Sequence, residues 1–500
     1  MTTSRAEGAT SAVYDVAVLG AGPAGLSAAV AAASQGSRTV LVDSAPRPGG
    51  QYWRHRAGDD GARHHDWDRF RRLERELAAQ PLLDHRPGCA VWHVERPAGA
   101  TDTRFVLHTT GPDAPRGPGG PDTPDAPRGP GGPAQRIAAR TVVVATGAYD
   151  RQLPFPGWTL PGVFTAGAVQ ALLKGQGVVA GKRIAVAGTG PFLLPVAAGL
   201  AEAGATVVGV YEAGLPTAFA AHPAATLRNL AKVAEGAGYL RTLRAHRVPY
   251  RTRTTVVAAH GTDAVTGATV ARLDRGWRVV PGTARTIDCD TVAVGYGFTP
   301  QTEIPVQLGC EMRRDADGSL VARVDTRQRA TTEGVYVAGE ACGVGGAQLS
   351  AVEGELAGLH AAHVTTGAAP GRGRLARLLR RRAALRSFAA ALHHAYPVPD
   401  GWLSWLDGAT TLCRCEEVTV GAVRTAIDTL GAADPRTVKL YARPGMGLCQ
   451  GRVCGYATTC LVARATGREP TAEDLRGVAG RPVASPVTLG ELAAGSDQDR

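Results

Sequence analysis

The feature that most constrains the fold is a glycine-rich turn placed between a strand and a helix near the start of the chain. Residues 14–19 form an apolar run typical of a buried strand, and residues 24–34 form an alanine-rich segment typical of a helix. The turn GAGPAG occupies residues 20–25, and residues 38–42 supply a second apolar run. A strand, a helix and a second strand in this order predict a βαβ unit at the start of an α/β domain.

The residues of the turn suit a bound dinucleotide. Gly20 permits a tight bend, Gly22 lets the backbone approach a pyrophosphate, and Gly25 allows close contact between helix and strand. The helix begins around Pro23-Ala24, so its N-terminus would face the phosphates. This turn alone is weak evidence, and the prediction of a dinucleotide depends on the segments that come later in the chain.

Later segments fit the same ligand. Asp43 ends the second strand, where a carboxylate accepts hydrogen bonds from ribose hydroxyls, and Ser44 with the turn Gly49-Gly50-Gln51 can wrap the pyrophosphate. The strand that starts at residue 142 ends on Ala145-Thr146-Gly147, where the chain would cross between two dinucleotide domains. The strand that starts at residue 331 ends on Gly339-Glu340, whose carboxylate can bond a ribityl hydroxyl, and the next helix can point its N-terminus at an isoalloxazine ring. Motifs in this order predict a site for FAD.

A second turn of the same kind, GTGPFL, occupies residues 188–193. Gly188 and Gly190 match the first two glycines, but Leu193 stands at the third position, so the helix is expected to approach its strand less closely. Glu212 closes the next strand and can hold an adenine ribose; a carboxylate there disfavours a 2′-phosphate and so favours NADH over NADPH. The alternatives are a domain that binds another adenine nucleotide, such as ATP, or no ligand. Strand-rich sequence is expected from there to Gly297.

Four cysteines near the C-terminus predict a metal centre. Cys413 and Cys415 form one close pair and Cys449 and Cys454 another, and the loops between them are rich in glycine, which leaves N–H groups free to bond cluster sulfurs. Two close pairs of thiolates suit a [2Fe–2S] cluster. Tetrahedral zinc and a purely structural role are the alternatives; the spacing Cys-x-Cys is tight for zinc. Cys460 lies beyond the pattern and is expected to be a buried thiol. Because no Cys-x-x-Cys lies near the FAD motifs, a disulfide-reductase mechanism lacks its dithiol.

Composition excludes several classes of protein. The net charge is +11, but only four of the 55 basic residues are lysines, and the basic run at 372–386 has no interleaved aromatic residues, so no nucleic-acid partner is expected. The sequence contains no run of 18 or more strongly apolar residues, so no membrane span is expected. The cysteines are unevenly spread along the chain, unlike those of a secreted disulfide framework, which indicates a cytoplasmic protein. The decapeptide PDAPRGPGGP occurs twice within 112–133, which predicts a disordered insert. The pairs His64-His65 and His393-His394 are expected to be exposed surface, and the tail after Arg481 to have little regular structure.

The predicted fold is α/β, a two-dinucleotide-binding-domain (Rossmann-like) flavoprotein with a small C-terminal iron–sulfur module. The FAD-binding domain is expected to combine residues 14–165 with 285–365, and an NAD(P)-type nucleotide-binding domain to occupy 166–284. A basic helical linker at 366–407, the iron–sulfur module at 408–470 and a C-terminal tail at 471–500 complete the plan.

The chain resembles a known family. ATGAYDRQLPFPGWTLPGVFTAGAVQALLK at 145–174 and the following GTGPFLLPVAAGLAEAGA are similar to two-dinucleotide-domain flavoproteins. These include the A subunits of octopine and nopaline oxidases, the B subunit of hydrogen cyanide synthase, and the alpha subunits of sarcosine oxidase and of proline and hydroxyproline dehydrogenases. CRCEEVT at 413–419 and GMGLCQGRVCG at 445–455 resemble the bacterioferritin-associated-ferredoxin-like module of that family.

The resemblance implies FAD at the first turn, a nucleotide at the second, and a [2Fe–2S] cluster on Cys413, Cys415, Cys449 and Cys454. Glu340 stands where an aspartate is commoner, and the second cysteine pair is longer than the Cys-x-x-Cys of the small ferredoxin. In such complexes a separate beta subunit usually oxidises the amine or imino acid. The Pro/Gly repeat is outside the family pattern.

These observations predict an electron-transfer subunit, alpha or A, of a heteromeric amine, imino-acid or opine-type dehydrogenase or oxidase, whose partner would be an amine-oxidase-like beta subunit. The sequence leaves the substrate and the electron acceptor open. One alternative is a self-sufficient NADH:acceptor reductase. Another is a non-catalytic redox sensor that would use the basic run and the Pro/Gly insert to bind partners. No general acid or base is assigned, because the cofactors carry the chemistry.

Overall fold

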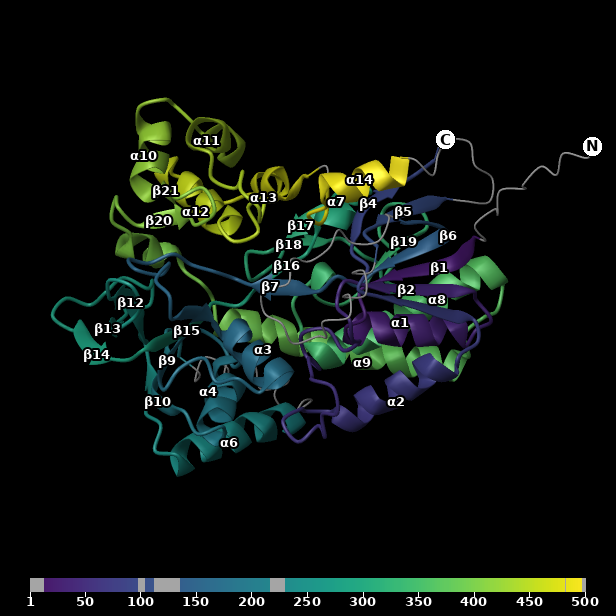
Figure 1. Cartoon of the computed structure of the whole chain (residues 1–500), viewed down its shortest axis with the longest axis horizontal. Helices are drawn as coiled ribbons and strands as arrows, with labels where there is room; N and C mark the ends of the chain where they lie inside the picture. Colours follow the sequence, from purple (N-terminus) through teal and green to yellow (C-terminus); the bar gives the residue numbers. More distant parts are fainter. Residues whose placement is uncertain (1–12, 98–103, 112–134, 216–229, 482, 497–500) are drawn as a thin grey trace, which may run out of the picture.

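The computed structural model describes residues 13–97, 104–111, 135–215, 230–481 and 483–496. The Pro/Gly repeat at 112–133 lies outside the described residues. Figure 1 shows two α/β regions at opposite ends of the molecule, with the C-terminal helices lying along one side of both.

The first region is built on a seven-stranded sheet with the order β3-β2-β1-β6-β5-β4, in which β19 also pairs with β6. Strands β1, β2, β3, β6 and β19 pair with one another in parallel, whereas β5 is antiparallel to both β4 and β6. This arrangement confirms the predicted βαβ unit. The strands are β1 (Tyr14–Leu19), β2 (Thr39–Asp43), β3 (Leu83–Pro87), β4 (Val91–Glu95), β5 (Phe105–Thr109), β6 (Gln135–Val144) and β19 (Val335–Val337).

Helices α1 (Pro23–Ala33) and α8 (Ala347–Thr366) pack against each other backbone to backbone, and α2 (Trp67–Ala79) lies beside α1. Two glycines of α8 make this approach possible. A Cβ atom on Gly354 would lie 1.9 Å from the carbonyl oxygen of Ala24, and one on Gly358 would lie 2.1 Å from that of Ala28. The helix after the first glycine-rich turn is therefore fixed by a segment more than 300 residues later in the chain.

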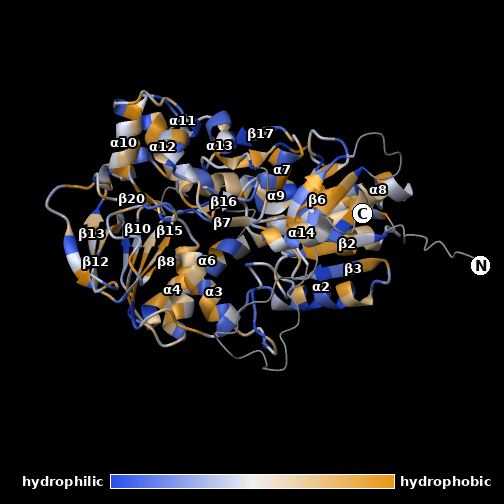
Figure 2. Ribbon diagram, turned by 45° about the horizontal axis from the view of Figure 1, so that its top comes forward, coloured by the Kyte–Doolittle hydropathy of each residue, from blue (hydrophilic) through white to orange (hydrophobic). Residues whose placement is uncertain are grey.

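The second region is a five-stranded parallel sheet with the order β11-β10-β9-β15-β8, flanked by a three-stranded antiparallel sheet, β12-β13-β14. Figure 2 shows hydrophobic residues concentrated on helix α4 and on the sheet strands. The expectation of strand-rich sequence up to Gly297 is wrong for residues 230–245, which form helix α6. The elements are β8 (Val163–Thr165), α3 (Ala166–Gln176), β9 (Arg183–Gly188), α4 (Leu193–Glu202), β10 (Thr206–Glu212), α6 (Leu230–Ala245), β11 (Tyr250–Thr252), β12 (Thr254–His260), β13 (Gly267–Arg272), β14 (Arg285–Asp288) and β15 (Thr291–Gly295).

Short elements connect the two regions. The antiparallel pair β7 and β16 forms where the chain enters and leaves the second region. A hairpin, β17 and β18, and a 3₁₀ turn, η2, then lead back to β19 and α8. The bounds are β7 (Ala148–Asp150), β16 (Phe298–Pro300), α7 (Glu303–Gln307), β17 (Met312–Arg314), β18 (Leu320–Ala322) and η2 (Gly339–Cys342).

The C-terminal third is mainly helical. Helix α9 (Arg372–Ala395) lies along α8, and a compact module of helices and one short hairpin comes after it. The tail is more regular than its sequence indicates, since it holds α13 (Ala472–Ala479) and, after Arg481, α14 (Leu489–Ser496). The module contains η3 (Asp400–Trp405), β20 (Thr411–Cys413), β21 (Val418–Thr419), α10 (Val420–Asp428), α11 (Pro435–Ala442) and α12 (Gly455–Ala465). Within the described residues, no helix has the length and apolar character needed to cross a membrane.

Candidate functional site

The first glycine-rich turn has the close contacts that its sequence predicts. Gly20 has a φ of +99°, and a Cβ atom on it would lie 2.5 Å from the carbonyl oxygen of Ala145. A Cβ on Gly25 would lie 1.6 Å from the carbonyl oxygen of Gly20. A side chain at either position would force the turn away from the strand ends. Helix α1 begins at Pro23, directly after the turn.

Asp43 is positioned by the end of β2 and braces this turn. One carboxylate oxygen accepts a hydrogen bond from the Ala21 N–H at 2.7 Å, and the other accepts one from the Ala45 N–H at 2.9 Å. Burial raises the pKa of Asp43, and these two N–H groups oppose that effect. The N–H of Gly22 faces no side-chain acceptor among the described residues, and Gly50 lies against Gly22, with its Cβ position 2.8 Å from the Gly22 Cα. The turn is lined by backbone, as a pyrophosphate site requires.

The remaining residues predicted for this ligand reach the same edge of the sheet. Ala338 donates to the carbonyl oxygen of Val144 at 3.0 Å, which brings the segments 145–147 and 339–340 side by side. Gly339 lies against α1, since its Cβ position is 3.1 Å from the Cβ of Ala24. Ser44 and Gln51 are exposed at the rim. Residues separated by hundreds of positions in sequence thus surround the first glycine-rich turn.

Glu340 makes contacts that the sequence did not indicate. Its carboxylate accepts hydrogen bonds from the N–H groups of Gly345 and Gly346, at 3.1 and 3.0 Å, which cap the start of α8. Burial raises the pKa of Glu340 to about 7. The side chain therefore orders the loop between η2 and α8.

The glycine-lined turn, the braced carboxylate and the Gly22 N–H, which no side chain in the described ranges accepts, fit the ADP half of FAD, and the loop around Glu340 fits its flavin half. Gly20, Gly22, Gly50 and Gly339 would line the path of the ligand, and Asp43 would face the ribose. A bound flavin supplies two-electron uptake and one-electron release. The protein contributes position and the exclusion of water.

The second glycine-rich turn is built differently. Gly188 has a φ of +135°, and its Cβ position is 1.8 Å from the carbonyl oxygen of Gly295. Leu193 is buried and is the first residue of α4, so the helix starts later in the motif than α1 does. The Glu212 carboxylate accepts hydrogen bonds from the Thr189 hydroxyl at 2.9 Å and from the Gly190 N–H at 3.0 Å.

Glu212 is closed in on its other side as well. The Gly214 N–H donates to it at 2.7 Å, and burial raises its pKa to about 7. Tyr396, at the end of α9, packs on this corner: its ring lies 3.3 Å from the Cβ position of Gly214, and burial together with the nearby Glu212 raises its pKa. The groups that would meet a ribose and a pyrophosphate are thus occupied by the protein itself.

The four C-terminal cysteines meet as two pairs. Cys413 and Cys454 are buried, and a hydrogen bond between them lowers the pKa of Cys413 to about 5 and raises that of Cys454. Cys415 is exposed and pairs with the partly exposed Cys449. The Gly445 N–H donates to the Cys413 sulfur at 3.4 Å. No group of three or more His, Cys, Asp or Glu side chains in the described ranges is arranged around one metal ion. Two pairs of thiols with N–H donors fit the two irons of a [2Fe–2S] cluster better than one zinc ion.

A buried charge cluster attaches this module to the first region. Arg452 lies between Cys449 and Cys454 in sequence, and its Nε is 2.8 Å from an oxygen of Glu303, at the start of α7. Arg481 donates to the same oxygen at 2.9 Å and to the carbonyl oxygen of Gln450 at 2.6 Å. Glu303 is nearly completely buried. The loop that carries two cluster cysteines is therefore fixed to the region that carries the FAD motifs.

A second contact reinforces this attachment. Arg151, which is 1% exposed, donates to Asp317 at 2.9 Å and lies over the ring of Tyr456 at 4.4 Å. The sequence patterns indicated neither arginine cluster, because each joins residues more than 100 positions apart. The one local sign of the first cluster was the position of Arg452 between two candidate cluster ligands, Cys449 and Cys454.

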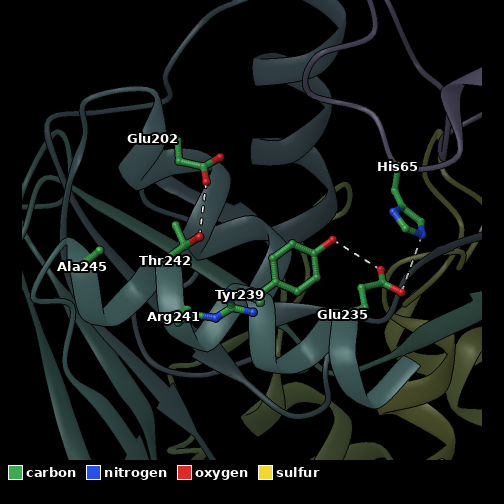
Figure 3. Close-up of a pocket in the computed structure, with 8 residues that line it drawn as sticks. His65, Glu202, Glu235, Tyr239, Arg241, Thr242 and Ala245 are labelled. Atoms are coloured by element: carbon green, nitrogen blue, oxygen red, sulfur yellow. Dashed lines mark hydrogen bonds and ion pairs between the residues drawn. The ribbon is translucent and has the colours of Figure 1, made fainter. Parts of the chain in front are cut away.

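An open groove of about 780 Å³ lies on α6, away from these residues. Figure 3 shows His65 facing Glu235 across it, while Glu202 holds Thr242. None of the predicted cofactor residues lines this groove. The expectation that His64 and His393 are exposed is wrong: His64 is buried and stacked on Trp67, and His393 is partly buried.

Comparison with known proteins agrees with this geometry. Residues 14–364 match the model of the pyridine nucleotide-disulphide oxidoreductase family, and residues 411–464 match the BFD-like [2Fe-2S] binding domain. The chain belongs to the pyridine nucleotide-disulphide oxidoreductase family. That family implies FAD, and the second domain implies an iron–sulfur cluster.

The relatives are subunits of oxidases and of a synthase. The A subunit of opine oxidase from Rhizobium meliloti is 33% identical, over 96% of this chain and 87% of that protein. Hydrogen cyanide synthase subunit HcnB of Pseudomonas aeruginosa is 33% identical, over 90% and 93%. The alpha subunit of sarcosine oxidase from Corynebacterium sp. (strain U-96) is 32% identical over 59% of this chain and 27% of that protein.

A solved structure shares the fold. The crystal structure of L-proline dehydrogenase from P. horikoshii superposes with a TM-score of 0.66, covering 96% of this chain and 79% of that chain at 20% identity. At this identity the likeness establishes the fold alone. Together with the two family matches, it confirms the predicted α/β flavoprotein fold with a C-terminal BFD-like module.

Proposed function

We propose that this oxidoreductase is the electron-transfer subunit of a heteromeric dehydrogenase or oxidase that acts on a C–N bond of an amine, imino acid or opine. A beta subunit would take a hydride from the substrate, and the electrons would pass to FAD at the first turn and then to the cluster on Cys413, Cys415, Cys449 and Cys454. The observation that carries the proposal is the buried attachment of the cluster loop to the region with the FAD motifs through Arg452 and Glu303. One chain then holds a two-electron and a one-electron group in fixed relation. The free cysteines are in keeping with work in the reducing cytoplasm.

The second turn supports a partner as the source of electrons. Glu212 takes the Gly190 N–H, and Tyr396 packs on the corner where an adenine ribose would lie. These contacts compete with NADH for the second turn, which disfavours a self-sufficient NADH:acceptor reductase. The names of the relatives, which are subunits of oxidases, point the same way.

The test is an anaerobic titration of the purified chain followed by flavin and cluster absorbance. We expect NADH to leave the flavin oxidised while dithionite reduces it, and the chain to be reduced by an amine or opine only when a beta subunit is added. Bleaching of the flavin by about one equivalent of NADH would overturn the proposal in favour of a reductase.

The cluster assignment has its own control within the chain. Cys454→Ser is expected to reduce bound iron and acid-labile sulfide from about two of each per chain to near zero. Cys460→Ser, six residues further on, should leave both unchanged. Equal iron content in the two variants would contradict the assignment.

A further inference from the structure

Helix α9 makes contacts that its sequence did not indicate. Its arginines suggested a solvated or partner-binding surface, but three of them pair with α8 instead. Arg374 contacts Glu355, while Arg382 and Arg386 both reach Glu353. Glu353 is fully buried. In Figure 1, α9 runs beside α8 and α1, the two helices next to the first glycine-rich turn.

Arg386 extends beyond this ion pair to the loop between η2 and α8. Its Nε and Nη2 donate to the two Glu353 oxygens at 2.8 and 2.7 Å. Nη1 donates to the carbonyl oxygen of Gly343 at 2.9 Å, and Nη2 lies 3.2 Å from the sulfur of Cys342. Gly343 has a φ of +132°, and a Cβ atom on it would lie 2.5 Å from the guanidinium. The glycine is therefore required for this approach.

The same face of α9 makes a second contact with the loop. His393, seven residues and two helical turns after Arg386, bonds the carbonyl oxygen of Val344 at 2.9 Å. Glu340 holds the N–H groups of Gly345 and Gly346 from the other side. Side chains of α9 thus bind the carbonyl groups of residues 343 and 344, and Glu340 binds the N–H groups of residues 345 and 346. These bonds fix the path of the loop into α8.

We propose that Arg386 is a positioning residue for the flavin half of FAD: it fixes loop 339–346 so that the loop and the start of α8 are preorganised to receive the isoalloxazine ring. This inference rests on the proposed FAD site. Loop 339–346 starts against Ala24 of the first glycine-rich turn and ends at the N-terminus of α8. Arg386 contacts no residue of the turn itself, so it acts on one half of the ligand and not on the ADP half.

The test compares two ligands on the deflavinated full-length chain. For Arg386→Gln we expect FAD to bind about tenfold more weakly, the effect of losing charge-assisted hydrogen bonds that hold the loop, while ADP affinity stays within about twofold. The fluorescence of bound flavin should also change, because the ring is held less firmly by the loop. Arg386→Lys should recover part of the FAD affinity. Arg374→Gln, which breaks a partly exposed ion pair between the same two helices, is the matched control and should change the affinity for neither ligand.

Loss of Arg386 alone leaves a buried carboxylate without its main partner, which can prevent folding. The double variant Arg386→Gln/Glu353→Gln removes both charges and should show the same selective loss of FAD affinity. Equal weakening of FAD and ADP, or unchanged FAD affinity, in either variant would overturn the inference. If the unmodified chain binds ADP but not FAD, the proposed function itself fails, and that result is recognised without any variant.

Discussion

The two glycine-rich turns of this chain have nearly the same sequence pattern, but their backbone N–H groups are hydrogen-bonded differently. In the first, the shorter Asp43 accepts hydrogen bonds from the N–H groups of Ala21 and Ala45, and the Gly22 N–H has no side-chain acceptor among the described residues. In the second, Glu212 is one methylene longer and takes the Gly190 N–H, the counterpart of Gly22. The Gly22 N–H of the first turn therefore remains for the proposed FAD, whereas the Gly190 N–H of the second turn is bound within the protein.

The helices after the two turns also differ, both in where they begin and in what packs beside them. Helix α1 begins at Pro23, directly after the turn, and is held by the glycines of α8. Helix α4 begins at Leu193, and Tyr396 from α9 packs nearby on Gly214. A glycine pattern therefore specifies the bend of the chain, while we propose that the carboxylate at the end of the next strand and the segments that pack on it determine whether a nucleotide can bind.

The largest effect that this comparison predicts is at Gly22. Its φ of −74° is accessible to any residue, and the nearest atom to a Cβ there is 3.9 Å away, so Gly22→Ala should fold normally. The methyl group would instead occupy the place of the pyrophosphate, and we expect FAD affinity to fall about 100-fold. Flavin titration and the melting temperature of the flavin-free protein measure the two effects. Wild-type affinity would show that the first turn does not hold the pyrophosphate.

A smaller effect is expected when the second turn is opened. Tyr396→Ala removes the ring from the corner at Gly214, and we expect NADH affinity to rise about tenfold from a dissociation constant above about 1 mM. Calorimetric titration of the full chain measures it. Tyr441→Ala removes an exposed ring elsewhere and serves as the control. Micromolar NADH binding to the unmodified chain would contradict the difference between the two turns, because the second turn would then be accessible without any substitution.

The smallest effect concerns the pH dependence of stability. Burial raises the pKa of Glu212 from 4.5 to about 7, so between these values the folded chain binds a proton that the unfolded chain has lost. Stability must therefore fall as pH rises, by about 1 kcal/mol relative to Glu212→Gln between pH 5.5 and 6.5. Glu340 has a pKa raised in the same direction, and its contribution cancels because both proteins contain it. If the melting temperatures of the two proteins changed with pH in the same way, Glu212 would not be buried as described.

Local patterns predicted the parts of the fold that local physics determines. Both βαβ units, the buried strands and the four cysteines were identified because period, turn chemistry and spacing are contained in short segments. Helix α6 was missed because Gly236 and Gly238 lower its helical propensity, and packing against α4 overrides that preference. The partners of Arg386 and Arg452 could not be predicted, since each joins segments whose proximity only the tertiary fold creates; the position of Arg452 between two candidate ligands was the one local sign of its cluster.

The late arrival of β19 has a consequence for the order of events during synthesis. Val335 pairs with Val142, which precedes it by 193 residues, whereas the second sheet draws all its strands from the intervening span 163–295. At about 5–20 residues per second, the ribosome makes the 193 residues that separate Val335 from Val142 in some 10–40 s, while the first sheet waits for its last parallel strand. The nascent chain can therefore complete the second region first. If FAD binds at the proposed site, the chain can take it up only after α8 has left the exit tunnel, which makes cofactor insertion a late step of biogenesis.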